Sequence, residues 1–172
     1  VKKGTAALAK VFSKEQALSE ANRAVRVPVK KIKPTVTEKR FEKTLLVDLS
    51  ERRIRLFVNG ELEKTYPCAV GTPGYPTPTG KYEIVLKRYL PTWVNPGSDW
   101  GKDMPASIPP GPGNPLGTRA LNIDAPGIRF HGTENIASVG TAASHGCMRM
   151  YRSDIEDLYE RVDVGNKVFI VP

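Results

Sequence analysis

Short strand-like runs separated by turn-forming residues restrict the fold of this chain more than any other sequence feature. From Thr44 onward, the runs LLVDLS, RIRLFVNG, ELEKTYPCAVG and KYEIVLK are rich in β-branched residues or alternate apolar with polar positions, a pattern typical of strands. Asn59-Gly60 stands between the second and third runs and predicts a tight hairpin. We therefore expect four strands by Lys87 and a mainly β fold.

A long proline- and glycine-rich stretch interrupts this pattern. Residues 96–118 contain six Pro and five Gly, so we expect no regular structure there. Loops of this length in compact domains usually belong to functional sites, and a lid or substrate wall is the natural interpretation. Beyond it, ALNI and IRFH flank Ala125-Pro126-Gly127, where Pro and Gly suit the central positions of a type II turn. KVFIV closes the chain as a final strand.

One helix is expected after these strands. Ser153 and Glu156 form a capping-box pattern at the start of SDIEDLYERV. Ile155, Leu158 and Val162 recur at helical spacing, so one face of this helix should be apolar. The expected fold is mainly β, with one or two short helices and a long Pro/Gly loop.

The first 40 residues differ in charge from the rest. They carry eleven Lys and Arg against three Asp and Glu, whereas residues 41–172 carry fifteen of each, so the formal net charge of +8 arises in this segment. A helix is expected to begin at Ser13 and to end before Pro28, because proline cannot continue it. We therefore expect a basic helical and extended segment at 1–42 and a β domain at 43–172.

Composition restricts the partners of the chain. A nucleic-acid partner is not expected, because the basic excess does not lie on the β domain. The basic segment is most simply a solvated linker, and attraction to anionic wall polymers or lipid head groups is the alternative.

No apolar run approaches the roughly 20 residues that span a membrane. The start at Val1 is expected of a fragment without its export segment.

Both histidines and one of the two cysteines fall within 17 positions, in His131-Gly132-Thr133 and Ser144-His145-Gly146-Cys147. A free thiol is mostly protonated at neutral pH, and a neighbouring imidazole that accepts its proton is the usual way to activate it. Gly146 allows a tight turn, so the N–H groups of Gly146 and Cys147 are candidates for binding an oxyanion. The pattern predicts thiol-based acyl transfer.

The stretch FHGTENIASVGTAASHGCMRM resembles the signature of L,D-transpeptidases of the YkuD type. TPTGKYEI and PASIPPGPGNPLG are similar to the same family, so the resemblance covers roughly residues 44–172. It implies a β-sandwich catalytic domain that acts outside the cytoplasm, in the bacterial cell wall. Such enzymes release the terminal D-alanine of a peptidoglycan tetrapeptide, hold the remainder as a cysteine thioester and pass it to an amine, forming a 3-to-3 cross-link.

The resemblance also implies roles for individual residues. Cys147 would be the nucleophile and His131 the base, with the carbonyl of Gly132 holding the imidazole ring. His145 and Gly146 would shape the oxyanion region. The substrate contacts implied are Arg149, which would meet a carboxylate, and Ser144, Thr133 and Trp93. No metal or cofactor is implied, and the partners are peptidoglycan stem peptides. Carbapenems acylate the cysteine in many relatives, so Cys147 is where such an adduct would form, but the sequence does not determine whether this chain is sensitive to them.

Several alternatives stay open at this point. The same chemistry would serve a carboxypeptidase or an endopeptidase, and a non-catalytic wall-binding module is a third function. His131, His145 and Cys147 are an incomplete zinc set. Cys68 either pairs with Cys147 in a disulfide or packs inward. Arg149 is an alternative partner for Asp154 or Glu156. The segment VRVPVKKIKPTVTEKRF is similar to the end of a peptidoglycan-binding domain.

Overall fold

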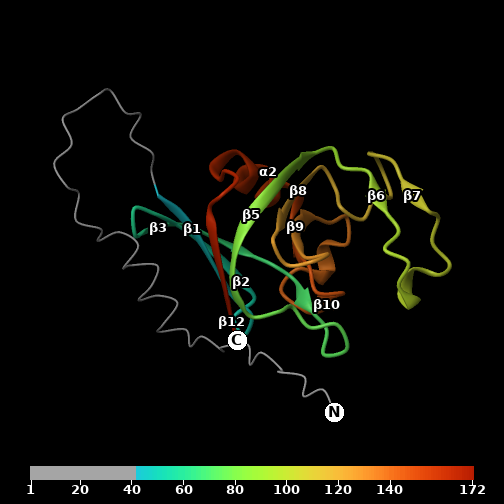
Figure 1. The fold of residues 1–172 in the computed structure, drawn as a ribbon, viewed down its shortest axis with the longest axis horizontal. Coiled ribbons are helices and arrows are strands. Elements are labelled where there is room, and N and C mark those ends of the chain that lie inside the picture. Colours follow the sequence, from blue (N-terminus) through green and yellow to red (C-terminus); the bar gives the residue numbers. More distant parts are fainter. Residues whose placement is uncertain (1–41) are drawn as a thin grey trace, which may run out of the picture.

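The computed structural model describes residues 42–172, so the helix expected from Ser13 and the basic extended segment lie outside the described residues. The main sheet has eight strands in the order β11-β9-β8-β5-β12-β1-β2-β3 (Figure 1). These strands are β1 (Lys43–Asp48), β2 (Arg53–Val58), β3 (Glu61–Pro67), β5 (Gly80–Tyr89), β8 (Arg119–Ile123), β9 (Arg129–Gly132), β11 (Met148–Met150) and β12 (Lys167–Val171). The prediction of a mainly β fold is confirmed.

The smaller elements lie between these strands. Two short pairs are β4 (Val70–Gly71) with β10 (Ala142–Ser144) and β6 (Trp93–Val94) with β7 (Ser107–Ile108). The α-helix within residues 42–172 is α2 (Arg152–Arg161), and two 3-10 turns cover Asp99–Gly101 and Ile136–Ser138. The four strand segments predicted before Lys87 and the three predicted after residue 118 are all present.

Strand β5 turns the sheet into a barrel-like sandwich. Its first four residues, Gly80 to Glu83, pair with β12, whereas Ile84 to Tyr89 pair with β8. The register shifts between Ile84 and Leu86, as expected where a strand bends from one layer into another. At the far side, Ala69 just beyond β3 forms an antiparallel bridge with Arg149 of β11. The two ends of the sheet therefore meet.

Both predicted turns are confirmed. Asn59 and Gly60 have φ angles of 51° and 85°, as a two-residue hairpin between β2 and β3 requires. Between β8 and β9, the N–H of Ile128 donates to the carbonyl of Ala125 at 3.1 Å, and Gly127 has a φ of 76°. This second turn determines where β9 begins, and therefore where His131 lies.

Helix α2 packs its predicted apolar face into the core between the layers. Ile155, Leu158 and Val162 are fully buried, in one cluster with residues of β1, β2, β8, β9 and β12. The predicted capping box is wrong, because the helix begins at Arg152 and its N-cap makes no side-chain hydrogen bond. Glu156 instead accepts a 2.6 Å hydrogen bond from the hydroxyl of Thr118, which ties the helix to the long loop.

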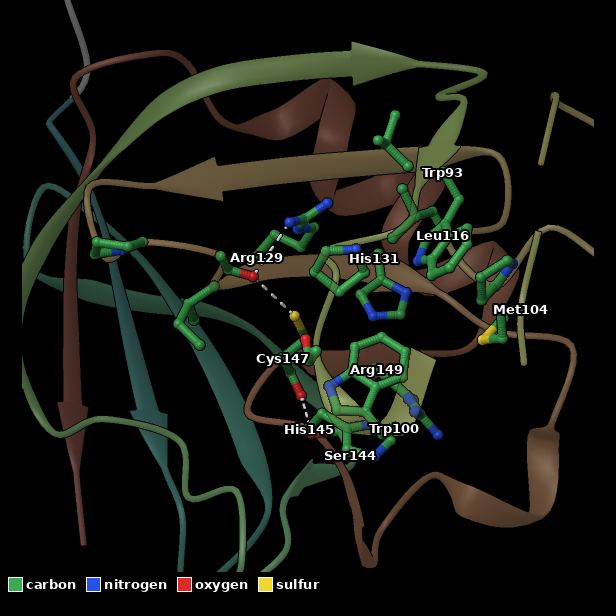
Figure 2. A pocket seen from close by; sticks show the side chains of 17 residues that line it. Trp93, Trp100, Met104, Leu116, Arg129, His131, Ser144, His145, Cys147 and Arg149 are labelled. Atoms are coloured by element: carbon green, nitrogen blue, oxygen red, sulfur yellow. Dashed lines mark hydrogen bonds between the residues drawn. The ribbon is translucent and has the colours of Figure 1, made fainter. Parts of the chain in front are cut away.

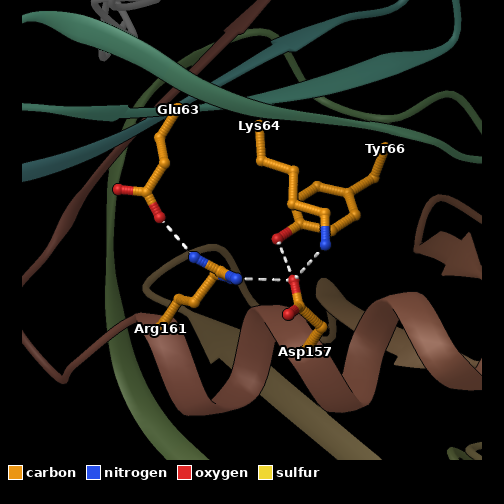
Figure 3. A network of polar contacts seen from close by, with 5 residues as sticks. All are labelled: Glu63, Lys64, Tyr66, Asp157 and Arg161. Carbon is orange, nitrogen blue, oxygen red and sulfur yellow. Dashed lines mark hydrogen bonds and ion pairs between the residues drawn. The ribbon is translucent and has the colours of Figure 1, made fainter.

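A polar network joins the other side of α2 to β3 (Figure 3). Asp157 Oδ2 accepts hydrogen bonds from the Tyr66 hydroxyl at 2.6 Å, Lys64 Nζ at 3.0 Å and Arg161 Nε at 2.9 Å. Arg161 also pairs with Glu63. Because Tyr66 is 1% exposed, its hydroxyl depends on this carboxylate for a partner, and the network fixes the helix against the strand.

The long loop is more ordered than predicted. It contains the 3-10 turn and strand β7, so the expectation of no regular structure is wrong in part. Asn114 is 1% exposed, and its side-chain amide donates to the carbonyls of Pro91, Ile108 and Pro109 while its oxygen accepts from the N–H of Leu116. One buried side chain thus replaces the regular backbone pairing that so many Pro residues prevent.

Candidate active site

The site is built on one face of the parallel pair β9 and β11. Their register places Phe130 opposite Met148 and His131 opposite Arg149. Alternate side chains of a strand point to opposite faces. Phe130 and Met148 are fully buried in the core, so the neighbouring positions on both strands must project to the other side. Continuing the register by one residue places Cys147 opposite Arg129.

A pocket of about 430 Å³ covers this face. Figure 2 shows the sulfur of Cys147 and the imidazole of His131 directed into the same cavity. The long loop forms the opposite wall, as predicted, with Trp100, Met104 and Leu116 among its lining residues. Trp93 of β6, predicted as a substrate contact, also lines the cavity and is 5% exposed.

The thiol of Cys147 makes its hydrogen bond to a backbone carbonyl and not to His131. It donates to the carbonyl of Gly127 with an Sγ–O distance of 3.4 Å. Burial raises the pKa of the thiol, while the positive charges of Arg129 and Arg149 and a backbone hydrogen bond from Arg129 act in the opposite direction. The thiol is therefore protonated at neutral pH, and it must be deprotonated before it can attack an electrophile.

His131 is held as a neutral base. Its Nδ1 lies 2.7 Å from the carbonyl oxygen of Gly132, the contact expected from the family resemblance. Burial lowers the pKa of the imidazole to about 4, with smaller contributions in the same direction from Arg149 and Arg129. Since a carbonyl only accepts, Nδ1 carries the proton and donates it to Gly132. Nε2 is then the ring nitrogen that can take a proton, and a hydrogen bond with the backbone of Pro115 also favours the protonated ring.

The loop before the nucleophile is closed by its own hydrogen bonds. Ser144 Oγ donates to the carbonyl of Cys147 at 2.6 Å and accepts from the N–H of Gly146 at 3.1 Å. Gly146 has a φ of 103°, and a Cβ there would lie 2.9 Å from Ile128 Cδ1. Only glycine therefore fits this position without strain.

These bonds bear on two predictions, the oxyanion donor at Gly146 and the substrate contact of Ser144. The N–H of Gly146 is directed at the Ser144 hydroxyl, so it is not the free oxyanion donor that we expected. The N–H of Cys147 has no hydrogen-bond partner among residues 42–172, and it is the remaining candidate. Ser144 is 1% exposed and holds the loop; its contact with substrate stays a prediction.

Thr77 is a site residue that sequence reasoning missed. Its buried hydroxyl donates to the carbonyl of Gly146 at 2.9 Å and accepts from the N–H of Gly71 at 2.8 Å. It therefore connects the cysteine loop to the segment before β5. A Cβ on Gly71 would lie 2.2 Å from the carbonyl of Tyr75, so this approach also requires a glycine. The only available signal was the family-like TPTGKYEI stretch.

An aromatic contact joins the long loop to the cysteine loop. The Trp100 indole stacks on the imidazole of His145, with ring centroids 4.3 Å apart and planes 12° apart. Tyr75 meets the same imidazole edge-on at 4.7 Å, and Trp93 lies 6.3 Å from Trp100. His145 is exposed on its outer side. Its ring therefore forms part of the pocket wall and connects two loops that are distant in sequence.

The remaining residues are placed as follows. Arg149 lines the pocket and forms no ion pair within the part of the chain that the structure describes, so the alternative of a salt bridge to Asp154 or Glu156 is wrong. Glu156 pairs with Arg152 instead. Thr133 does not line the pocket, and its hydroxyl accepts from the N–H of Asn135 at 3.1 Å.

The alternatives for the cysteines are also resolved. Cys68 and Cys147 are both free thiols, which excludes the disulfide between them. Cys68 packs inward, fully buried, and burial raises its pKa to about 12. No group of three His, Cys, Asp or Glu side chains within residues 42–172 is arranged to hold a metal ion.

The sequence profile of the YkuD L,D-transpeptidase catalytic domain matches residues 42–170. The chain belongs to this family. The YkuD protein of Bacillus licheniformis, named as an L,D-transpeptidase, is 34% identical over 128 residues, covering 74% of this chain and 65% of that protein. The ErfK/SrfK protein of Escherichia coli is 31% identical over 137 residues, covering 75% of this chain and 44% of that protein.

Solved structures agree on the fold of this YkuD domain. L,D-transpeptidase 3 from Mycobacterium tuberculosis superimposes with a TM-score of 0.66 at 20% identity, covering 77% of this chain and 62% of that one. An L,D-transpeptidase from Mycobacterium smegmatis gives the same TM-score. The chain spans less than two thirds of the length of these relatives. None of the helices in residues 42–172 is both long and apolar enough to cross a membrane.

Proposed function

We propose that this YkuD domain forms 3-to-3 cross-links in peptidoglycan, with Cys147 as nucleophile and His131 as general base. The proposal rests on one observation: a protonated thiol and a neutral, oriented imidazole line the same pocket. A free thiol and a base in one cavity are the two groups that acyl transfer through a thioester requires. Family membership supports the same chemistry.

The first half-reaction consumes a tetrapeptide stem. His131 Nε2 takes the proton of the Cys147 thiol, and Sγ attacks the carbonyl carbon of the third residue. The negative charge on the carbonyl oxygen is stabilised by the free N–H of Cys147, with His145 beside it. The bond to the terminal D-alanine breaks, its nitrogen receives the proton from His131, and D-alanine leaves. The product is a thioester on Cys147.

The second half-reaction releases the enzyme. An amine of another stem attacks the thioester carbonyl and gives its proton to His131, which returns it to the sulfur as the C–S bond breaks. Attack by water would instead yield a tripeptide, which is the carboxypeptidase alternative. The Pro, Trp, Met and Leu side chains in the cavity wall limit access of water to the thioester.

The decisive experiment compares the wild type with Cys147→Ala on a purified disaccharide-tetrapeptide, with products identified by mass spectrometry. We expect a cross-linked dimer and free D-alanine from the wild type only. Cys68→Ala is the matched control, because it removes a thiol that is buried outside the pocket. Tripeptide without dimer contradicts cross-linking and supports hydrolysis. No product from correctly folded wild type contradicts both activities.

We further propose that carbapenems acylate Cys147 and that the domain acts outside the cytoplasm, at the cell wall. Relatives with this fold have been solved with a faropenem-derived adduct and in complex with imipenem. The proposed substrate is a wall polymer, so the proposed activity requires a domain on the outer side of the membrane. Intact-protein mass spectrometry after incubation with imipenem tests the adduct. An unmodified mass for the wild type would contradict it.

A division of the chain follows from the same proposal. Residues 43–172 form the catalytic domain, and residues 1–42 are a basic linker or the end of a preceding peptidoglycan-binding domain. A fragment of residues 42–172 should therefore retain cross-linking of the soluble disaccharide-tetrapeptide. Complete loss of activity in a correctly folded fragment would contradict this division.

A further inference from the structure

The pocket carries charge of one sign only. Its lining residues include Arg129, Arg149, His131, His145 and Cys147 but no Asp or Glu. The two guanidinium groups form no ion pair within residues 42–172. Two cations that lack an acidic partner and face a partly enclosed cavity favour any anion that forms there. The nearest group that can become an anion is the thiol of Cys147.

Arg129 is joined to that thiol through a shared acceptor. Its Nη2 donates to the carbonyl oxygen of Gly127 at 3.2 Å, and the sulfur of Cys147 lies 3.4 Å from the same oxygen (Figure 2). Arg129 also stands opposite Cys147 in the extended register of β9 and β11. The guanidinium and the sulfur therefore bond the same oxygen, and the two residues stand opposite each other in the sheet.

One donor of this guanidinium is unused. The Nε of Arg129 is buried and has no hydrogen-bond partner in the structure. An unpaired buried donor costs free energy, and a cationic one is stabilised when an acceptor with negative charge forms close by. The shared carbonyl of Gly127 loses its contact with the sulfur once the thiol proton has left, but it keeps its contact with Arg129.

Other groups around the sulfur do not provide the same effect. His131 is neutral at rest, since burial opposes its protonation. Partial desolvation and the charge of Arg149 lower the pKa of the largely exposed His145 as well. Arg149 is the second cation; it stands opposite His131, and it lowers the pKa of the thiol less than Arg129 does. Among the groups that face Cys147, Arg129 is therefore the cation in the best position to act on the sulfur.

We propose that Arg129 is a positioning residue for the nucleophile: its guanidinium bonds the Gly127 carbonyl that accepts from the neutral thiol of Cys147, and its charge stabilises the thiolate once the proton has left. The inference rests on the proposed role of Cys147, but it concerns thiol ionisation and not transfer to a stem peptide. Under this proposal, the charge of Arg129 stabilises the thiolate before substrate binds and before His131 is protonated.

The test is the rate of Cys147 alkylation by iodoacetamide as a function of pH, which requires no peptidoglycan. At an effective dielectric constant between that of protein and that of water, a cation that shares a hydrogen-bond acceptor with the thiol lowers the apparent pKa of the thiol by about one unit. Arg129→Gln should therefore react about tenfold more slowly at pH 7 and reach the wild-type rate at high pH. Arg129→Lys keeps the charge and should restore most of the difference. Cys147→Ala measures any reaction at Cys68.

Arg152→Gln is the matched control, because it removes an exposed arginine that pairs with Glu156 outside the pocket. Its alkylation profile should equal that of the wild type. An unchanged alkylation profile for Arg129→Gln overturns the proposal. The proposal is also overturned if Arg129→Lys alkylates as slowly as Arg129→Gln although its thermal unfolding equals that of the wild type. Failure of cross-linking alongside a shifted alkylation profile would count against the proposed function and leave the role of Arg129 standing.

Discussion

The network around Asp157 allows a stability prediction that can be worked out from the structure. Replacing Asp157 with Ala removes the acceptor of three hydrogen bonds, two of which join β3 to α2 while the third lies within α2 (Figure 3). The largest loss is at Tyr66, whose hydroxyl is left buried without a partner at a cost of about 1–3 kcal/mol. Lys64 and Arg161 are 42% and 38% exposed, so water replaces their contacts and each adds no more than about 0.5 kcal/mol.

We therefore expect Asp157→Ala to lower the free energy of unfolding by about 2 kcal/mol. Tyr66→Phe should cost about 1 kcal/mol, because the carboxylate keeps its two cationic partners. In the double variant the two losses should not add, and the coupling should be about 1 kcal/mol. Urea unfolding followed by circular dichroism measures all four proteins, with Arg152→Gln as a surface control.

The same pair has a defined pH dependence. Hydrogen bonds and the charge of Arg161 hold the pKa of Asp157 well below its ordinary value of 3.8. A depressed carboxyl pKa stabilises the folded state above that value, and the stabilisation is lost as the pH falls below it. The difference between wild type and Asp157→Ala should therefore shrink below pH 3.8. Additive single losses, or a cost below about 0.5 kcal/mol at pH 7, would refute the reasoning.

Three further predictions concern the pocket. Trp100→Ala removes the stack on His145, so kcat/KM for the tetrapeptide should fall about three- to tenfold, measured by steady-state kinetics; an unchanged value would show that the stack does not shape the site. In Gly146→Ala, the new Cβ would have a backbone φ of 103° and would lie 2.9 Å from Ile128 Cδ1. Thermal unfolding should therefore show a free energy of unfolding lower by about 2 kcal/mol. A change no larger than that of a typical surface variant would contradict this. Because burial lowers the pKa of His131 from 6.5 to about 4, the unfolded chain binds more protons in this range, and stability should fall by up to about 3 kcal/mol as the pH decreases from 6.5 to 4. His131→Gln should lack this part of the decrease, and an identical pH profile for the two proteins would rule out the burial effect.

Local chemistry made most of the fold predictable. The turn at Asn59-Gly60 and the turn at Ala125-Pro126-Gly127 depend on φ preferences of single residues, and both formed where expected. The strand runs and the apolar face of α2 depend on short periodicities, which report burial directly. The capping box of α2 failed for a tertiary reason, since Glu156 is bound by Thr118 from a distant loop.

The sequence by itself determined which chemical groups the site contains and which turns bring them to strand ends, because residue type and local backbone preference act over a few positions. The tertiary structure alone decided their partners. The thiol of Cys147 donates to the carbonyl of Gly127, the N–H of Gly146 donates to Ser144, and Arg129 donates to the same Gly127 carbonyl as the thiol. These contacts arise from the register of β9 with β11 and from loop closure over long sequence separations. Burial in that assembled pocket then shifts each pKa, and neither effect is encoded in any short segment.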